Sequence, residues 1–505
     1  MLKTIKLKRK QINKINKSKY SKSSDERRSA SWDIQNAPKN YLSLVLTQIG
    51  SAFFTFASVW LISKTLGSEG YGGIVAIIAA SQVAQVLVNW TSVAVVRFGV
   101  DEFIETEKIA RAFWIRLFIL LPNLLFVLLV SNLWFPPLAV WLRLAPEIFP
   151  LVFLHFTVNA FWIHIQFSFQ AVKMPRLQGG LMAVERILTF TSLLILLASG
   201  KLNSISAMVC YAVAPLAMVF AGFFFLRKFI FARFSADRAF IKKIFVYSLP
   251  LLPFTLVGYF SGGYVDAVFI SKFLSTRDLG IYSIAMQISG ITLQLPTIAN
   301  SLLTPMFISL QKENRTSRLD EYFKHILPSL VLAWSFFSAL LAFAGYFFIP
   351  IIFGEEFSQA VAPFWILLVA STFSLPILIG YSALSHSISA TYISMFAAIF
   401  SAFANITLNF LLIPKFGAEG CAWASVVMNF VSSATFYVLL RRSSQIALSW
   451  LFEAMLPLLG AAVVFSITRN PFVSLAVCAM IGILIILLHK NSLREAFNFL
   501  KIFRK

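Results

Sequence analysis

The sequence contains fourteen apolar runs, each long enough to cross a lipid bilayer as a helix, a length of about 20 residues. Hydrophobic residues make up 58% of the chain and charged residues 13%, whereas a soluble domain carries about 25% charged residues. This composition excludes an ordinary soluble enzyme and a disordered chain, and the unbroken runs exclude a transmembrane barrel. The sequence therefore predicts an all-α polytopic membrane protein. The runs are 40–63, 73–96, 112–135, 148–169, 178–199, 203–226, 244–270, 280–308, 326–349, 360–383, 389–412, 419–440, 450–468 and 472–489.

The Lys and Arg residues predict how the chain is oriented. With fourteen spans, 35 of the 43 Lys and Arg residues fall on one side and seven on the other, while Arg186 lies within a span. Positive loops stay on the cytoplasmic side. We therefore expect an inner-membrane protein with both termini in the cytoplasm, and basic segments that contact anionic lipids. Residues 1–39 are expected to form a basic tail rather than a signal peptide.

The sequence lacks the patterns expected for nucleic-acid binding, metal binding and enzymatic catalysis. The basic residues cluster between apolar runs, which argues against binding to nucleic acid despite a net charge of +22. The three cysteines lie far apart inside apolar runs, and His155 and His164 are nine residues apart, so neither set has metal-ligand spacing. No phosphate-binding glycine loop or nucleophile constellation is found. We expect no metal, no cofactor and no enzymatic activity.

A short internal repeat predicts a duplicated architecture. Ser63-Lys64-Thr65-Leu66 with Gly72 matches Ser271-Lys272-Phe273-Leu274 with Gly280 at a constant offset of 208 residues. Both stretches join an odd-numbered span to the next one on the non-cytoplasmic side. Many transporters consist of duplicated halves. We therefore predict a basic tail (1–39), two six-helix bundles (40–243 and 244–440), and two further helices with a second basic tail (441–505).

Motifs distributed from residue 40 to about residue 440 resemble one known family. The chain is similar to the polysaccharide transporters, the Wzx-type flippases of O-antigen and capsule repeat units, within the superfamily that also holds the MATE drug exporters and the lipid II flippases. Ala267 follows Asp266 where members of the family often have a basic residue. The matching motifs are Leu66-Gly67-Ser68-Glu69-Gly70-Tyr71-Gly72, Val96-Arg97-Phe98-Gly99, Tyr247-Ser248-Leu249-Pro250, Asp266 before Phe269-Ile270, Leu279-Gly280-Ile281-Tyr282, Phe353-Gly354-Glu355-Glu356-Phe357, and Leu408-Asn409-Phe410-Leu411-Leu412-Ile413-Pro414 running into Phe416-Gly417.

The resemblance implies two MATE-like bundles that face each other across a central cavity and export a lipid-linked oligosaccharide. The cargo that it implies is an undecaprenyl-diphosphate-linked repeat unit for O-antigen, capsule or exopolysaccharide synthesis. A polysaccharide polymerase and a chain-length regulator are the protein partners that we expect.

Charged residues at membrane depth are costly and are therefore candidates for function. Arg97, Arg116 and Arg186 offer guanidinium groups that suit phosphate oxygens, and we predict that they bind the head group together with Glu185. An ion pair between Glu185 and Arg186, and snorkelling of Arg97 and Arg116 to the cytoplasmic headgroups, are the structural alternatives.

Asp266 and the start of the seventh span are candidates for coupling and for movement. A carboxylate at membrane depth can bind H⁺ or Na⁺, so Asp266 is predicted to couple transport to an ion gradient, with pairing to Lys272 or Arg277 as the alternative. Pro250, Pro253, Gly262 and Gly263 interrupt the seventh span and predict a hinge there.

Polar and aromatic residues in the spans leave both functional and structural interpretations open. Phe161, Trp162, His155 and His164 could stack on sugars or pack at the bilayer interface. Asn405 and Asn409 could line a hydrated path or bond helix to helix.

Two other functions compete with the flippase interpretation. A MATE-type exporter of cationic drugs would favour an acidic cavity, whereas these spans hold more Arg than carboxylate. A membrane enzyme that polymerises or ligates glycans would need catalytic groups on a large outer loop, and the predicted outer loops are short.

Overall fold

The computed structural model describes residues 47–233, 238–249, 263–312, 316–388, 390, 392–443 and 450–502. In these ranges the regular structure is helical, without a strand. Nine of the described helices are long and apolar enough to cross a membrane. The predicted all-α membrane fold is therefore confirmed. The basic tail at 1–39 and the hinge residues Pro250, Pro253 and Gly262 lie outside the described residues, and Gly263 is the first residue of α10.

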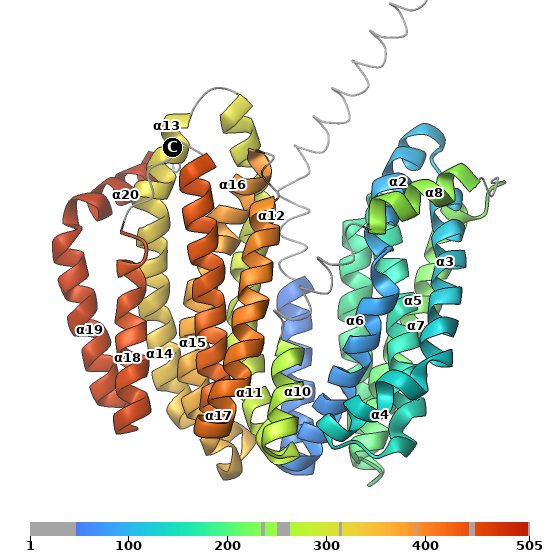
Figure 1. The fold of residues 1–505 in the computed structure, drawn as a ribbon, viewed down its shortest axis with the longest axis horizontal. Coiled ribbons are helices and arrows are strands. Elements are labelled where there is room, and N and C mark those ends of the chain that lie inside the picture. Colours follow the sequence, from blue (N-terminus) through green and yellow to red (C-terminus); the bar gives the residue numbers. More distant parts are fainter. Residues whose placement is uncertain are drawn as a thin grey trace, which may run out of the picture.

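The first half of the chain forms one group of helices (Figure 1). It comprises a first helix Thr47–Asn89, α2 (Ser92–Thr106), α3 (Ala110–Leu129), α4 (Ser131–Leu142), the 3₁₀ turn η1 (Pro146–Ile148), α5 (Phe149–Ala171), α6 (Pro175–Ala198), α7 (Ser204–Ile230) and α8 (Arg238–Ser248).

The second half forms the other group. It comprises α10 (Gly263–Phe273), α11 (Thr276–Thr292), α12 (Gln294–Lys312), α13 (Thr316–Glu321), the π-helical turn η3 (Tyr322–Ile326), α14 (Leu327–Phe353), η4 (Glu355–Ala360), α15 (Val361–Pro376), the π-helical turn η5 (Ile377–Tyr381), α16 (Ser382–Ser387), α17 (Tyr392–Ser443), η6 (Glu453–Met455), α18 (Leu456–Thr468), α19 (Pro471–Leu488) and α20 (Lys490–Ile502).

Two long helices each contain two of the predicted spans. The helix Thr47–Asn89 includes Gly67 at φ 68°, and α17 includes Gly417 at φ 60°. Glycine adopts this left-handed backbone without the steric cost of a Cβ atom. Each glycine therefore marks the point where the chain turns from one predicted span into the next. Both turns fall between the spans that the sequence predicts.

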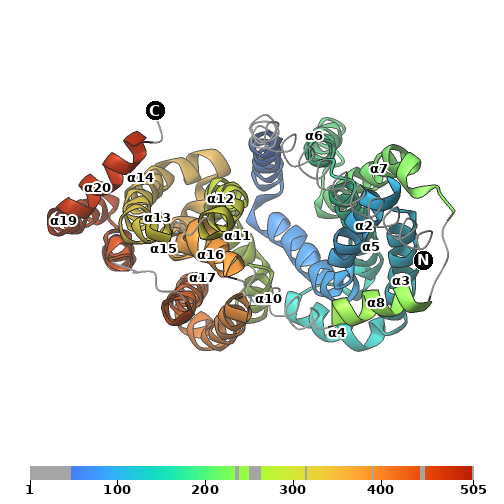
Figure 2. The same ribbon diagram turned by 90° about the horizontal axis from the view of Figure 1, so that it is seen from above.

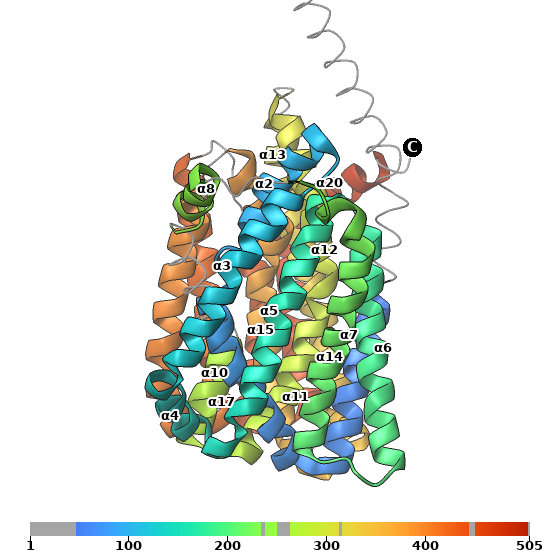
Figure 3. The ribbon, with the colours of Figure 1, turned by 90° about the vertical axis from the view of Figure 1, so that its right-hand side faces the viewer.

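The predicted seventh span differs from the structure at its beginning. Residues 244–248 belong to α8, which is a separate element that packs on α2, with the ring of Phe98 against both Phe240 and Tyr247. Phe240, Ile244 and Ser248 are buried at intervals of four residues, whereas Lys242 and Lys243 are exposed. This amphipathic pattern explains why α8 lies across the ends of the upright helices of the first half (Figure 3).

Seen from above, the two groups of helices stand side by side (Figure 2). They approach most closely at the lower end of Figure 1, where α4 contacts α10 and the first helix reaches the second half. Lys108, Lys173 and Lys228 lie at the opposite end. We call this upper end the basic end, and the lower end, which contains Gly67 and Gly417, the non-basic end.

Candidate functional site

The two halves meet at a close crossing of the first helix and α11. A Cβ atom on Gly72 would lie 1.9 Å from the carbonyl oxygen of Thr276, and one on Gly280 would lie 1.9 Å from the carbonyl oxygen of Ser68. Ser68 and Thr276 are 208 residues apart, as are Gly72 and Gly280. The offset of the sequence repeat therefore reappears as a symmetric contact, which we call the glycine crossing.

Polar bonds between the halves surround the glycine crossing. The backbone N–H and the hydroxyl of Ser68 donate to the Glu356 carboxylate at 3.1 and 2.8 Å. Nε of Arg143 donates to the carbonyl oxygen of Ser271 at 2.9 Å. The Lys272 ammonium lies 3.6 Å from the centre of the Trp141 ring. The non-basic end is thus closed by both close packing and directional bonds.

Asp266 lies buried in the second half among neutral hydrogen-bond donors. Its Oδ1 accepts from Asn405 Nδ2 at 3.3 Å and from Asn409 Nδ2 at 3.0 Å. Its Oδ2 accepts from Tyr282 at 3.0 Å and from Ser425 at 2.9 Å. These residues come from α10, α11 and both parts of α17. We call Asp266, Tyr282, Asn405, Asn409 and Ser425 the carboxylate cluster.

The buried Asp266 carboxyl of the carboxylate cluster has no described counter-charge. No Lys or Arg is paired with Asp266 among the described residues, so the alternative pairing with Lys272 or Arg277 does not occur there; Lys272 contacts Trp141 instead. The Oδ1 atom of Asn409 is buried and accepts no hydrogen bond. In the described part of the chain, no group of three or more His, Cys, Asp or Glu side chains could hold a metal ion. The side chains of the cluster carry oxygens but no sulfur or imidazole, a composition that suits an alkali cation or a proton better than a transition metal, although Asn405 and Asn409 turn their Nδ2 atoms toward Asp266.

Arg186 lies near residues of both halves. It is about one-third exposed and lies 3.5 Å from the buried Glu185, whose other oxygen accepts from Trp162 Nε1 at 2.9 Å. Arg186 is also close enough to act electrostatically on His155, on Tyr211 of α7 and on Tyr264 of α10. The ion pair foreseen as the alternative is present, and it leaves the Arg186 side chain about one-third exposed.

The other two candidate arginines lie elsewhere. Arg97 is exposed on α2 and pairs with Asp101 at 2.6 Å. Arg116 is completely buried within the first half, where its Nη2 donates to Asn89 at 3.0 Å and to Ser92 at 2.8 Å. No contact joins Arg97, Arg116 and Arg186 in the described residues, so these three predicted head-group residues do not form one cluster in this conformation.

The histidines and aromatic residues of the fourth span pack inside the first half. His155 Nδ1 shares a hydrogen bond with Ser81 at 2.7 Å, and the His164 ring lies 4.4 Å from the ring of Phe113. Trp162 is buried against Glu185. Phe161 packs beside the core of the first half. In this conformation His155, Trp162 and His164 are thus buried inside the first half, which corresponds neither to a sugar-stacking surface nor to packing at the bilayer interface.

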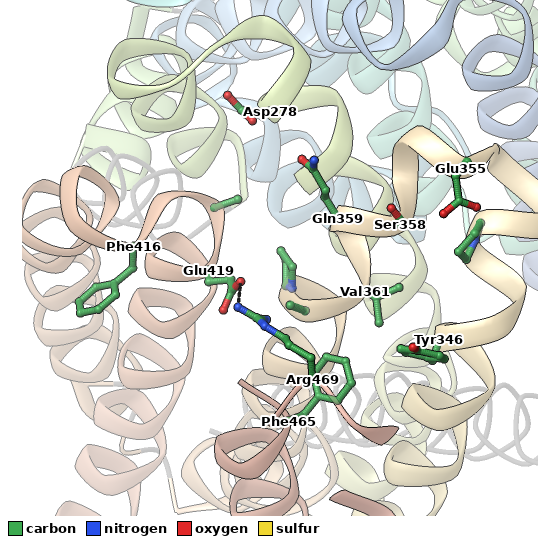
Figure 4. A pocket seen from close by; sticks show the side chains of 14 residues that line it. Asp278, Tyr346, Glu355, Ser358, Gln359, Val361, Phe416, Glu419, Phe465 and Arg469 are labelled. Atoms are coloured by element: carbon green, nitrogen blue, oxygen red, sulfur yellow. Dashed lines mark hydrogen bonds and ion pairs between the residues drawn. The ribbon is translucent and has the colours of Figure 1, made fainter. Parts of the chain in front are cut away.

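Two hollows accompany these sites. One is a cavity of about 660 Å³ near the non-basic end, where Tyr346, Phe465 and Gln359 surround the ion pair of Arg469 with Glu419 at 2.6 Å (Figure 4). The other has a volume of about 710 Å³ and an almost entirely apolar lining from the first helix, α11 and α14, including Phe53, Phe56 and Trp334. The second hollow could accept a hydrocarbon chain.

Two groups of helices that meet at one end, with helices long and apolar enough to cross a membrane, define the class of multi-pass membrane proteins. Comparison with a solved lipid II flippase, MurJ in an inward closed conformation, gives a TM-score of 0.64 at 13% identity over 90% of this chain and 99% of that one. The MATE transporter VcmN of Vibrio cholerae gives 0.53 at 13% identity, over 81% and 98%. At these identities the likeness shows the fold alone.

A family model described as "polysaccharide biosynthesis protein" matches residues 104–362, which is just over half of the chain. The chain therefore belongs to the polysaccharide biosynthesis protein family, and the family prediction is confirmed. A probable low-salt glycan biosynthesis flippase, Agl15 of Haloferax volcanii, is 25% identical over 190 residues, which are 37% of this chain. An uncharacterized membrane protein of Methanocaldococcus jannaschii is 24% identical over 238 residues. The matches span 39% and 46% of these two relatives.

Proposed function

We propose that this protein is a flippase that carries undecaprenyl-diphosphate-linked oligosaccharide repeat units across the cytoplasmic membrane. The two bundles would work by alternating access, with the glycine crossing closed when the basic end is open. Transport, rather than catalysis, is the proposed activity. The single observation that carries the proposal is Arg186, a partly exposed guanidinium within a membrane-spanning helix that acts electrostatically on tyrosines of both halves, Tyr211 and Tyr264.

Arg186 suits the diphosphate of such a cargo for physical reasons. A guanidinium group binds phosphate oxygens in a bidentate manner and stays protonated. Nη1 of Arg186 lies 3.5 Å from Oε1 of Glu185. Because this carboxylate contacts only one side of the guanidinium, the other N–H groups of Arg186 stay available to a phosphate. Arg97 is proposed to meet the head group earlier, at the basic end, whereas Arg116 would reach it only after rearrangement of the first half.

The apolar hollow suits the polyprenyl tail. It is bounded by the first helix from one half and by α11 and α14 from the other. A hydrocarbon chain there would stay in an apolar environment while the sugars pass between the halves. The Haloferax relative, which is named a glycan biosynthesis flippase, supports this choice of cargo.

We propose further that the carboxylate cluster couples transport to an ion gradient, with Na⁺ as the favoured ion and H⁺ as the alternative. Asp266 would supply the charge, Ser425 would supply a hydroxyl oxygen, and Asn405 and Asn409, which donate to Asp266 through Nδ2 in this conformation, would supply carbonyl oxygens. The unpartnered Oδ1 of Asn409 supports this, because a buried oxygen without a donor is costly and a cation would satisfy it. The carboxamides of Asn405 and Asn409 would turn their oxygens toward the ion.

The excess of basic residues in one set of loops supports an inner-membrane protein with both termini in the cytoplasm and anionic lipids against those loops. On the outer face, a polysaccharide polymerase and a chain-length regulator would take up the product. The rigid parts proposed for the movement are the two predicted bundles, 40–243 and 244–440, and the predicted hinge at 250–263 joins them.

The cellular test is to deplete the protein from its own host and label the sugars of lipid-linked repeat units from outside. A flippase predicts that unpolymerised repeat units accumulate on the inner face, out of reach of the label. Accumulation of labelled, unpolymerised repeat units on the outer face would instead point to a glycan-joining enzyme and contradict the proposal.

A further inference from the structure

The interruption between the first helix and α2 contains a buried arginine whose donors are only partly used. The first helix ends at Asn89, and α2 begins at Ser92 without a side-chain cap from Thr91. Arg116 extends from the second turn of α3 into this interruption and is completely buried. Only its Nη2 has partners, which are the side-chain oxygens of Asn89 and Ser92.

The remaining polar atoms around Arg116 lack partners as well. Its Nε and Nη1 are buried and donate to no described atom. The hydroxyl of Thr91 and both ring nitrogens of His164 are also buried without partners, and His164 is close enough to Arg116 to interact electrostatically. No acidic side chain is paired with Arg116 in the part of the chain that the structure describes.

An isolated buried guanidinium is energetically unfavourable, because desolvation of the charge is not repaid by a partner. The positive end of the α2 dipole lies at the same place, where no side chain caps the N–H groups of Ser92 and Val93, while the Ala94 N–H donates to the Thr91 carbonyl at 3.2 Å. A guanidinium, a helix N-terminus and an imidazole together form an environment of donors that lacks an anion. Complete burial limits the size of that anion to a single small ion.

We infer that the first half binds a small inorganic anion, of the size and charge of chloride, between Arg116 and the N-terminus of α2. The ion would accept from Nε and Nη1 of Arg116, from the Thr91 hydroxyl and from the backbone N–H groups of Ser92 and Val93. The site lies inside one bundle, uses no contact between the halves and belongs to the conformation described here, so it stands or falls separately from the later head-group contact proposed for Arg116. Its role would be to hold the interruption between the first helix and α2 in one geometry.

The test uses the purified full chain in detergent and compares its Tm in sodium chloride with its Tm in sodium gluconate at equal sodium concentration. Gluconate is too large for the site. A ligand that binds the folded state raises Tm in a concentration-dependent way. We expect Tm to rise and then saturate as chloride replaces gluconate. Equal Tm values in the two salts would overturn the inference and indicate water in the site.

Variants test whether the chloride response comes from the site at Arg116. Arg116→Gln is expected to lose the chloride response, whereas Arg97→Gln, an exposed arginine paired with Asp101, keeps it. A chloride response that survives in Arg116→Gln would overturn the assignment. If Arg116→Gln does not fold, Thr91→Val keeps the charge and removes one donor, so its response should shift to higher chloride concentration. Crystals of the wild-type chain grown in sodium bromide should show an anomalous peak beside Arg116 Nη1, and absence of that peak would also overturn the inference.

Discussion

Gly72 and Gly280 face each other where the first helix crosses α11, and a Cβ atom on either would overlap a carbonyl oxygen of the opposite helix at 1.9 Å. Both glycines occupy the same position in a repeat with an offset of 208 residues. Equivalent positions of the repeat therefore meet in a reciprocal contact, and the closed state of the non-basic end depends on the absence of side chains at the two glycines.

Gly72→Ala is expected to force the halves apart at the non-basic end, since the carbonyl of Thr276 belongs to helical backbone and cannot easily move away. Overpacking of this kind costs about 1–3 kcal/mol. Cross-linking between cysteines introduced at Ser68 and Thr276 should therefore fall. Gly73→Ala is the matched control, because no atom lies within 4 Å of its Cβ position. Equal cross-linking in both variants would contradict the role of the glycine crossing.

Glu356→Gln is expected to favour opening at the same end. The carboxylate accepts both the N–H and the hydroxyl of Ser68, and loss of a comparable helix cap costs about 0.5–2 kcal/mol. The measurement is the rate at which a membrane-impermeant maleimide labels a cysteine placed at Thr276, which lies at the glycine crossing and leaves the Ser68 hydroxyl in place, and this rate should rise. Glu355→Gln, the neighbouring carboxylate in the cavity of Figure 4, should leave this rate unchanged. If the two variants label alike, Glu356 does not hold the halves together.

Ser425→Ala is expected to weaken the proposed sodium site. It removes a hydroxyl that lies 2.9 Å from Asp266 Oδ2, and a hydrogen bond to a charged group contributes about 1.5–3 kcal/mol. The sodium concentration for half-maximal transport should therefore rise by about tenfold or more. Ser433→Ala is the control, because Ser433 lies in the same helix, is buried and makes no hydrogen bond. An unchanged sodium dependence in Ser425→Ala and Asp266→Asn, with transport retained, would exclude the carboxylate cluster as the coupling site.

Arg186→Gln is expected to raise the KM for the lipid-linked substrate by about 10- to 100-fold, which corresponds to about 1.5–3 kcal/mol for a charge-assisted hydrogen bond. Arg186→Lys should recover only part of the affinity, because an ammonium group lacks the planar fork of donors. Arg97→Gln changes an exposed arginine and should have a smaller effect. Equal KM values for wild type and Arg186→Gln would remove Arg186 from the head-group site.

The sequence predicts the helices well because crossing a bilayer demands long apolar segments with internally satisfied backbones. It also predicts the equivalence of Gly72 and Gly280, although not that the two glycines touch. Contact requires the positions of the first helix and α11 in space, which no local pattern encodes.

The carboxylate cluster and the buried position of Arg116 were harder to predict from the sequence, because both depend on how the helices pack. Asp266, Asn405 and Asn409 are conspicuous as polar residues in apolar spans, but Ser425 and Tyr282 are ordinary residues until packing brings them to the same carboxylate. Arg116 begins a span and by position alone resembles an interfacial arginine. Its burial follows from the packing of α2 and α5 against α3, which only the tertiary structure reveals.

The central claim is that this protein flips lipid-linked oligosaccharide, and proteoliposomes test it most directly. They would contain the purified chain and undecaprenyl diphosphate that carries a fluorescent NBD-labelled saccharide in both leaflets. Dithionite, which does not cross the bilayer, reduces only outer-leaflet label. The account predicts that dithionite removes nearly all of the fluorescence when the wild-type chain is present. With Arg186→Gln, it should remove only the outer-leaflet fraction of the fluorescence in the same time. The same assay would be run with a sodium or proton gradient imposed in either direction. If the wild-type chain then loses only the outer-leaflet fraction of the fluorescence, the account is contradicted.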